Sequence, residues 1–462
     1  MVFTGYSARY LGVADWGIIS GALAFVTMLQ VLGDLGLSQV AAREIARNPS
    51  VAAALLGNAA IVKVGLSLLL GVLVWLLGTL LGYGDLHIRI TGILVLHAIF
   101  TSYSNLAYAL FQAKQRLEYR ALGHVLSSCL MLAGAFVVVR ADGGVIGLAG
   151  VYLVSSLAVL ALNGWVVRRK FVPPRLALDL TVVGRAIRAG LPFSATLFVS
   201  GFFLQLDLML LTLLRGSDET GLYGAAATVI TVATFVADAF VLATFPVTSR
   251  LYVENPTALR KAIDRSAKYL LVLGMLFACG GTLLADVIVD FVYGADFTGA
   301  VLPLQLLCLY LPVRFVSHVL GWALPSMDRE PLRTMGATAA ALTNLVLNLV
   351  LIRPYGLIGA AVGSVISQIV LYALYSRFVS KHIQRASLRP VVWRTILSAV
   401  AMAVVVVGLR PYLNIVFVTA AGIGAFAAVL WAVGTVDSED AAVARELIRQ
   451  VTGSPAREAS QR

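Results

Sequence analysis

Charged residues are scarce in this chain: they make up 13% of its 462 residues, whereas 60% are hydrophobic. Soluble globular proteins carry about 25% charged residues. The mean hydropathy is +0.90, and apolar runs long enough to cross a bilayer fill nearly the whole length. This balance excludes a set of soluble domains and predicts a protein that crosses a membrane many times.

The sequence also lacks the signatures of metal sites, nucleotide sites and enzymes. Its three cysteines, Cys129, Cys279 and Cys308, lie inside apolar runs and form no C-x-x-C pair, so we expect neither a disulfide nor a zinc site. No G-x-x-x-x-G-K-[ST], H-E-x-x-H or G-x-S-x-G motif occurs. We therefore expect no cofactor, no direct drive by ATP and no enzymatic activity.

Thirteen apolar runs follow one another with short gaps. Backbone groups in hydrocarbon need internal hydrogen bonds, so we expect each run to be a helix. The runs lie at 16–40, 51–81, 88–110, 121–139, 145–167, 187–213, 222–247, 269–293, 300–324, 334–352, 357–379, 395–409 and 412–434.

Lysine and arginine are unequally divided between alternate loops. One set of loops, together with the C-terminal tail, carries 27 of them, and the other set carries six. Positive charge concentrates on the cytoplasmic side of membrane proteins, so we expect the first set and the C-terminus to be cytoplasmic in a cell-membrane protein. The same loop charge accounts for the net charge of +12, and no nucleic-acid binding is expected.

Parts of the sequence occur twice. GLIGAAVGSVISQIVLYAL (356–374) aligns without a gap with 144–162, 212 residues earlier, and seven of the nineteen positions are identical. Residues 11–17 resemble 215–221 at an offset of 204, and the stretch from Tyr108 to Arg120 resembles the stretch from Trp322 to Arg333. Three pairs in the same order, at similar offsets, indicate a duplicated unit.

The duplication predicts the organisation of the chain. The counterpart of the span at 187–213 would begin before Met1, so we expect residues 1–9 to be the outer end of a helix whose body is absent; a complete chain of thirteen spans is the alternative. We expect two parallel six-helix bundles with a site between them, as in transporters that rock one half against the other. The predicted parts are a first bundle at 1–175, a second at 176–385, two further helices at 386–436 and a cytoplasmic tail at 437–462.

Several stretches resemble the prokaryotic polysaccharide flippases. They are ARYLGVADWG (8–17), DLGLSQVAAREIAR (34–47), QLDLMLL (205–211), VDFVYGADFTGAVLPLQLL (289–307) and NLVLNLVLIRPYGLIGAAVGS (344–364). That family is similar in fold to multidrug and toxin extrusion transporters and to the peptidoglycan lipid flippase. The resemblance implies transfer of a polyprenyl-pyrophosphate-linked oligosaccharide across the membrane, and it makes a glycan polymerase or glycosyltransferases candidate partners.

Polar side chains inside spans are the candidate substrate ligands, because a charged headgroup needs a wet path through hydrocarbon. Arg314 lies at the centre of its span, where an arginine costs roughly 2.5–3.5 kcal/mol. It either binds phosphate or pairs with Asp207 or Asp238. Those two acids are themselves candidates for ion coupling or for structural ion pairs.

Four further residues complete the predicted substrate set: Lys63, Arg43, Asn344 and Asn348. Lys63 either faces the cavity or extends to the cytoplasmic surface. Arg43 either meets the substrate at the cytoplasmic mouth or only sets orientation. Asn344 and Asn348 share one helix face and are ligands or interhelical hydrogen-bond partners.

A drug antiporter of the same fold is the main alternative. An antiporter for small cations would rely on buried acids and show more of them than bases at mid-span. Here the spans contain two bases, Lys63 and Arg314, and two acids, Asp207 and Asp238. Acids do not outnumber bases, so the sequence leaves both functions open.

Overall fold

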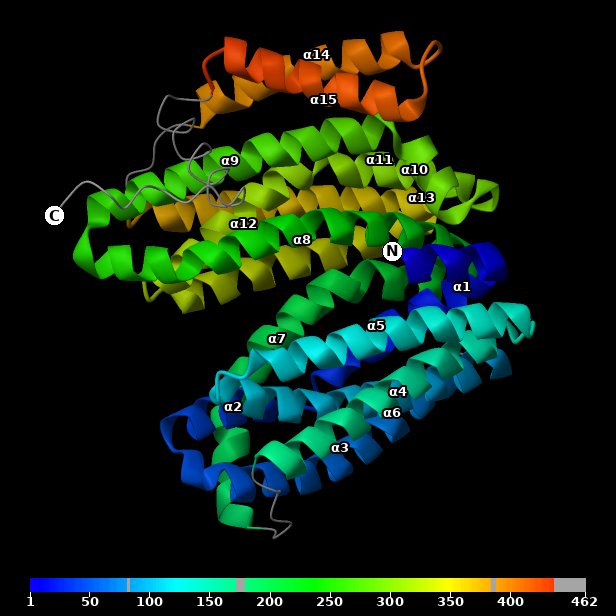
Figure 1. Cartoon of the computed structure of the whole chain (residues 1–462), viewed down its shortest axis with the longest axis vertical. Helices are drawn as coiled ribbons and strands as arrows, with labels where there is room; N and C mark the ends of the chain where they lie inside the picture. Colours follow the sequence, from blue (N-terminus) through cyan, green and yellow to red (C-terminus); the bar gives the residue numbers. More distant parts are fainter. Residues whose placement is uncertain (81–83, 172–178, 384–387, 436–462) are drawn as a thin grey trace, which may run out of the picture.

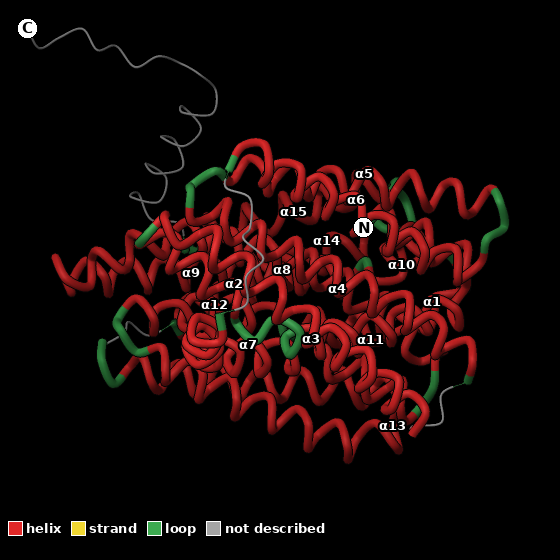
Figure 2. Tube along the Cα trace, turned by 90° about the horizontal axis from the view of Figure 1, so that it is seen from below, coloured by secondary structure: helices red, strands yellow, loops and turns green. Residues whose placement is uncertain are grey.

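Helices make up almost all of the computed structural model, which describes residues 1–80, 84–171, 179–383 and 388–435. Figure 2 shows helices joined by short loops, and no strand appears in these ranges. Helix is what apolar chain must adopt in hydrocarbon, because each backbone group then finds a partner in its own segment. The predicted all-α polytopic architecture is confirmed.

The helices form two lobes (Figure 1). The lobe drawn lower holds the helices of the first half, and the lobe drawn upper holds those of the second, with a final hairpin packed on α9. The first half consists of α1 (Val2–Gln30), α2 (Leu37–Arg47), α3 (Ala52–Leu80), α4 (Asp85–Ala113), α5 (Leu117–Arg140) and α6 (Gly144–Lys170). The second consists of α7 (Leu180–Leu214), α8 (Ser217–Glu254), α9 (Pro256–Leu283), α10 (Ala285–Tyr293), α11 (Val301–Leu309), α12 (Leu311–Ser326) and α13 (Glu330–Ser380). The hairpin is α14 (Arg389–Leu409) and α15 (Ile415–Ala432).

Helix α7 runs from the first lobe to the second, and α1 lies where the lobes meet (Figure 1). The turns that follow α4 and α8 lie at the left of that view, and those that follow α5 and α14 lie at the right. We call the left end the basic end, because the arginine-rich turns lie there, and the right end the opposite end. The predicted tail, 437–462, and the predicted bundle boundaries near 175 and 385 fall outside the described residues.

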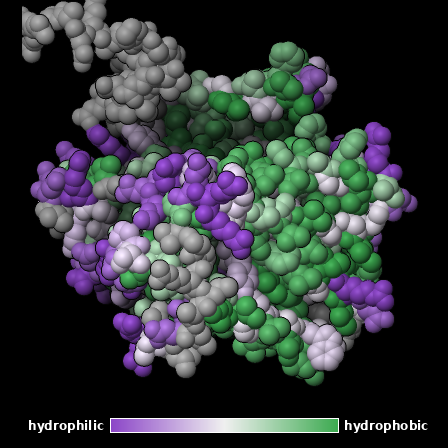
Figure 3. Space-filling view, turned by 60° about the horizontal axis from the view of Figure 1, so that its bottom comes forward, coloured by the Kyte–Doolittle hydropathy of each residue, from purple (hydrophilic) through white to green (hydrophobic). Residues whose placement is uncertain are grey.

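The molecule is a multi-pass membrane protein. Ten described helices are long and apolar enough to cross a membrane, and an eleventh span is counted if Ala295–Leu309 and Leu311–Ser326, which meet at 46°, are taken together. Each of the thirteen predicted runs overlaps a described helix; two of them share α13, which bends at Gly356. Figure 3 shows a broad hydrophobic surface with hydrophilic residues on either side, as a bilayer requires.

Three predicted runs are interrupted. The run 16–40 ends at Gln30, and a turn with Gly36 at φ 71° leads into α2. The run 269–293 breaks at Leu284, and the run 300–324 bends at Tyr310, ahead of Pro312. Glycine permits the positive φ and proline cannot continue a preceding helix, so these residues set two of the breaks.

The duplication is visible in the backbone. Gly12 bends α1 with φ 76° and ψ 179°, and Gly216 joins α7 to α8 with φ 89° and ψ −172°, at the offset of 204 seen in the sequence. Gly144 and Gly356, at the offset of 212, have φ values of 58° and 56°. Residues 2–11 therefore correspond to the last turns of α7.

A side-chain contact is repeated as well. The guanidinium carbon of Arg120 lies 5.7 Å from the ring centre of Tyr108 in the first half. That of Arg333 lies 4.4 Å from the ring centre of Trp322 in the second half. Each half thus places an arginine over an aromatic ring at its basic end.

The halves meet through a reciprocal contact between α1 and α8 at the opposite end. A Cβ added to Gly17 would lie 1.8 Å from the carbonyl oxygen of Ser217, and one added to Gly221 would lie 2.2 Å from that of Val13. Both pairs of equivalent residues are 204 apart, so the contact obeys the pseudo-symmetry of the duplication. No side chain larger than hydrogen fits at either glycine without separating the helices.

Candidate functional site: a polar cavity in the first half

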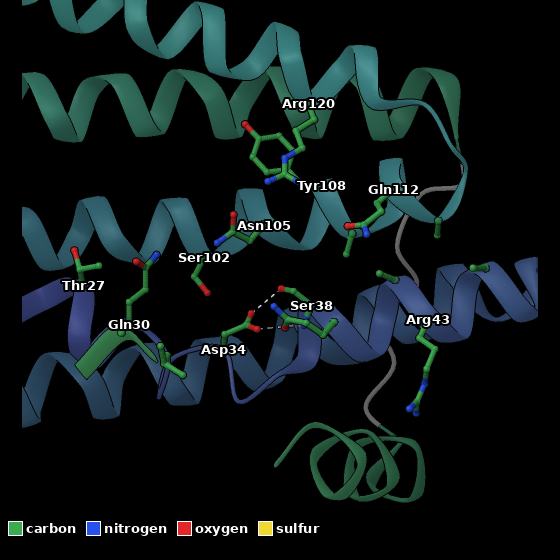
Figure 4. Close-up of a pocket in the computed structure, with 17 residues that line it drawn as sticks. Thr27, Gln30, Asp34, Ser38, Arg43, Ser102, Asn105, Tyr108, Gln112 and Arg120 are labelled. Carbon is green, nitrogen blue, oxygen red and sulfur yellow. Dashed lines mark hydrogen bonds between the residues drawn. The ribbon is translucent and has the colours of Figure 1, made fainter. Parts of the chain in front are cut away.

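A cavity of about 750 Å³ opens between α1, α2, α4 and α5, with Gly201 of α7 at its edge (Figure 4). Its walls are unusually polar for a membrane-embedded surface. The polar lining residues are Thr27, Gln30, Asp34, Ser38, Gln39, Arg43, Ser102, Asn105, Gln112 and Arg120. Those that lie within the apolar runs, such as Gln30, Asp34 and Ser102, are costly in a membrane, and such residues mark substrate pathways.

Local sequence explains how α2 presents its polar face. Leu37, Val40, Ala41 and Ile45 are buried, which leaves Arg43 and its neighbours on the cavity side. The turn before α2 holds Leu35 and Gly36 at positive φ, which redirects the chain. A helix with apolar and polar residues at this spacing has two distinct faces.

Helix α4 contributes a polar row of its own. Ser102, Asn105, Ala109 and Gln112 follow one another at spacings of three, four and three residues, which places them on one helix face. Figure 4 shows Ser102, Asn105 and Gln112 along α4, facing the segment that carries Asp34 and Ser38.

Lys63 lies beneath this cavity and is completely buried. Its Nζ donates to the carbonyl oxygen and the hydroxyl of Ser102, both at 2.8 Å, and forms an ion pair with Asp34. Asp34 also accepts from the Ser38 hydroxyl at 2.6 Å and from the backbone N–H of Ser38 at 3.3 Å, at the start of α2. Both predicted positions of Lys63 are wrong: it neither lines the cavity nor reaches the surface, and instead it neutralises Asp34.

Two arginines line the cavity. Arg43 lies 3.0 Å from Glu44 and extends away from α4 in Figure 4, and its place at the cytoplasmic mouth stays a prediction. Arg120 covers the Tyr108 ring from α5. Because Lys63 compensates Asp34, the ionisable groups of the lining leave an excess of positive charge.

A second polar cluster is buried in the second half, around Asp207 of α7. Its carboxylate accepts from Tyr223 Oη and Asn348 Nδ2, each at 2.6 Å, and from the Ser364 hydroxyl. Asn348 also donates to Asn344 Oδ1 at 3.1 Å. The two asparagines share a face as predicted, and both are buried in this network, in which Asn348 makes the interhelical hydrogen bond that is the predicted alternative to ligand binding.

Arg314 lines a small cavity of about 80 Å³ next to this cluster, together with Asp207 and Tyr310. Its guanidinium carbon lies 5.8 Å from the Tyr310 ring centre, and its buried Nε has no hydrogen-bond partner among the described residues. In the part of the chain described, no ion pair joins Arg314 to Asp238 or to Asp207, with which it shares this cavity, and its role as phosphate ligand or ion-pair partner stays a prediction. Asp238 instead lies 2.7 Å from Nδ1 of His318.

The sequence reading did not identify the α4 row or Arg120 as cavity residues. Arg120 belongs to a loop charge cluster, and Asn105 ends a short polar stretch, 101–105, inside an apolar run. The helical spacing of Ser102, Asn105 and Gln112 is the signal that could have found them. Asp34 and Asp238, which are 204 residues apart, are likewise equivalent by the repeat, and each is paired with a base in its own half.

Comparisons with known proteins agree with this architecture. Residues 1–252, more than half of the chain, match the family model described as "Polysaccharide biosynthesis protein". The chain belongs to this family. Two curated relatives are probable flippases of Haloferax volcanii, Agl15 and AglR; each is 23% identical, and each alignment covers 89% of this chain and 86% of the relative.

Solved structures show the same fold for this member of the polysaccharide biosynthesis protein family. The lipid II flippase MurJ, in an inward closed conformation, is similar with a TM-score of 0.76 at 16% identity, over 97% of this chain and 96% of MurJ. An inward-facing multidrug resistance transporter of the MATE family gives 0.68 at 17% identity, over 82% of this chain and 94% of the transporter. At these identities the likeness establishes the fold alone.

Proposed function

We propose that this protein transfers a polyprenyl-pyrophosphate-linked oligosaccharide across the cell membrane by alternating access. The polar, arginine-bearing cavity of about 750 Å³ inside a membrane-spanning bundle carries the proposal. The family match and the relatives named as flippases support it.

The chemistry follows from the substrate class. A pyrophosphate with its glycan must pass hydrocarbon about 30 Å thick, where an unpaired charge costs several kcal/mol. Arg43 and Arg120 offer planar guanidinium groups that suit phosphate oxygens. Lys63 contributes indirectly, because it cancels the negative charge of Asp34, which lines the cavity. Arg314, with a free Nε beside a small cavity, is a candidate second contact in the other half.

We place the basic end, and with it the C-terminus, in the cytoplasm. The distribution of 27 against six basic residues supports this orientation. In a background without native cysteines, a membrane-impermeant maleimide should label Tyr412→Cys in intact cells but not Gln115→Cys. The reverse pattern would invert the topology. Glycosyltransferases or a glycan polymerase that handle the same lipid are the expected partners.

We assign to Asp207 the coupling of transport to an ion gradient. The Asp207 carboxylate is surrounded by neutral donors, whereas Asp238 is paired with His318. Transport by Asp207→Asn should lose its response to an imposed Na⁺ or proton gradient, while Asp238→Asn should keep it. An unchanged gradient response in Asp207→Asn assigns that residue a structural role.

The drug-antiporter alternative has less support. Such a function needs an acid available to a cationic drug, yet Asp34 is paired with Lys63 and Asp238 lies against His318. MATE transporters share the fold, which does not decide the substrate.

Leaflet transfer tests the function. Full-length protein in liposomes should move a fluorescent polyprenyl-pyrophosphate oligosaccharide between leaflets. Arg43→Ala with Arg120→Ala should slow transfer by about tenfold or more, because hydrogen bonds to charged groups contribute about 1.5–3 kcal/mol each. The control Arg140→Ala changes an arginine that covers Phe136 at the opposite end and should transfer normally. Export of a cationic dye with no glycolipid transfer would refute the proposal.

A further inference from the structure

We propose that amide side chains of α4 and α2 recognise the sugar attached to the pyrophosphate, so that the first half selects the glycan. The residues are Asn105 and Gln112 on α4 and Gln39 on α2. This inference rests on the proposed function and assigns the substrate's sugar portion to a particular wall of the cavity.

The three amides are available to a ligand. All three are exposed and line the cavity, and none makes a hydrogen bond to another residue in the described part of the chain. By contrast, the neighbouring Gln30 donates to the carbonyl oxygen of Ala98, and Asn58 donates to that of Ala54. Gln30 and Asn58 are thus held by the backbone, whereas the three cavity amides are not.

Their spacing suits an extended polar ligand. Asn105 and Gln112 are seven residues apart on one face of α4, which separates them by about 10 Å along the helix. Gln39 lies on α2, on another wall of the same cavity. An amide offers both donors and an acceptor, so it complements sugar hydroxyls, which also do both. Apolar compounds cannot use this set, and a cation can use only its acceptor oxygens.

The duplication supplies an internal comparison. Tyr108 corresponds to Trp322, and by that offset Asn105 and Gln112 correspond to Val319 and Ser326 on α12. By the offset that relates Gly12 to Gly216, Gln39 corresponds to Ala243 on α8. The equivalent helices fold and pack without these amides. Helix packing therefore does not require them, and a ligand confined to the first half accounts for their presence.

The position of the two arginines sets the orientation of the bound substrate. Arg43 and Arg120 lie in the same cavity as the amides. Pyrophosphate held by a guanidinium leaves its first sugar next to the α4 row. A site built to hydrogen-bond hydroxyls discriminates strongly against ligands that lack them, because its polar groups then stay unpaired.

The test is a binding comparison with two probes, using the full chain in nanodiscs. One probe is polyprenyl pyrophosphate with no sugar, and the other is the same lipid bearing an oligosaccharide. Asn105→Ala combined with Gln112→Ala should weaken binding of the glycosylated probe by roughly thirtyfold, since two neutral hydrogen bonds contribute about 1 kcal/mol each. Binding of the sugarless probe should change less than about twofold. Gln115→Ala, an amide outside the cavity, is the matched control and should bind both probes normally.

The outcomes separate this inference from the proposed function. Arg43→Ala with Arg120→Ala should weaken both probes. If wild type binds neither probe, the flippase proposal itself fails. If wild type binds both, and the amide variant either binds both normally or loses both equally, the sugar assignment is wrong while the flippase proposal stands.

Discussion

The least expected single residue is Lys63, which is fully buried inside a membrane bundle. An isolated ammonium group at that depth would be strongly destabilising. The Asp34 carboxylate and two oxygens of Ser102 satisfy all three of its N–H groups. The pair therefore costs little as long as both members are present.

Removing either member should expose this dependence. We expect Lys63→Met and Asp34→Asn each to lower the free energy of unfolding by roughly 3–5 kcal/mol, because each leaves an uncompensated buried charge. The double variant should recover much of the loss. Thermal unfolding of the purified protein in detergent measures all three, and Arg116→Met, which breaks the exposed pair with Glu118, serves as the control and should change little. A double variant as unstable as the sum of the singles would show that the pair is not coupled.

Sequence alone located the polar residues at depth but not their partners. Helical spacing correctly put Asn344 and Asn348 on one face, since that depends only on 3.6 residues per turn. It could not tell whether that face meets water or Asp207, because the answer depends on α7, which is distant in the sequence. The environments of Lys63 and Arg314 likewise depend on neighbouring helices. The sequence therefore allowed two positions for Lys63 and two roles for Arg314.

At the scale of elements, hydropathy predicted the helices well and their breaks poorly. The sequence remains apolar through Leu284 and Tyr310. Its average hydropathy therefore predicts one continuous span at each place where the chain in fact bends. The break before α2 has another cause, because two constraints require glycine at Gly36. Its φ is positive, and an added Cβ would lie 2.4 Å from the carbonyl oxygen of Gly190 on α7. Such a contact between elements has no signal in a single sequence.

A pair of glycine substitutions tests that contact. Gly36→Ala should lower the free energy of unfolding by at least about 1–2 kcal/mol, the penalty for a left-handed residue with a Cβ, before the clash with Gly190 is added. Gly65→Ala, on α3 with open space around the new Cβ, should be neutral or stabilise by about 0.5–1 kcal/mol. Denaturation midpoints in detergent measure both. Equal effects at the two positions would mean that the α2–α7 approach contributes nothing.

For the whole molecule, the duplicated sequence predicted two related halves, and the paired bends at Gly12 and Gly216 show the relation in the backbone. What the sequence could not give is where the halves touch. They meet at the opposite end through Gly17 and Gly221, and Arg9 of α1 donates to carbonyl oxygens of Asp290, Phe291 and Val292 where α10 ends. The opposite end is therefore held by the first half reaching across to the second.

Alternating access requires this contact to open once in each cycle, and a cross-link can test that requirement. A Cβ on Gly224 of α8 would lie 3.2 Å from the Cβ of Ser20 on α1, slightly closer than the roughly 3.5–4.5 Å of disulfides. In a background lacking Cys129, Cys279 and Cys308, Ser20→Cys with Gly224→Cys should form a disulfide on oxidation. Leaflet transfer should then fall to the protein-free level and return when a reductant is added. Each single variant, treated with the same oxidant, should keep transferring. If the cross-linked protein transfers at the rate of the reduced protein, the halves do not separate at this end, and the substrate takes a path that leaves the α1–α8 contact closed.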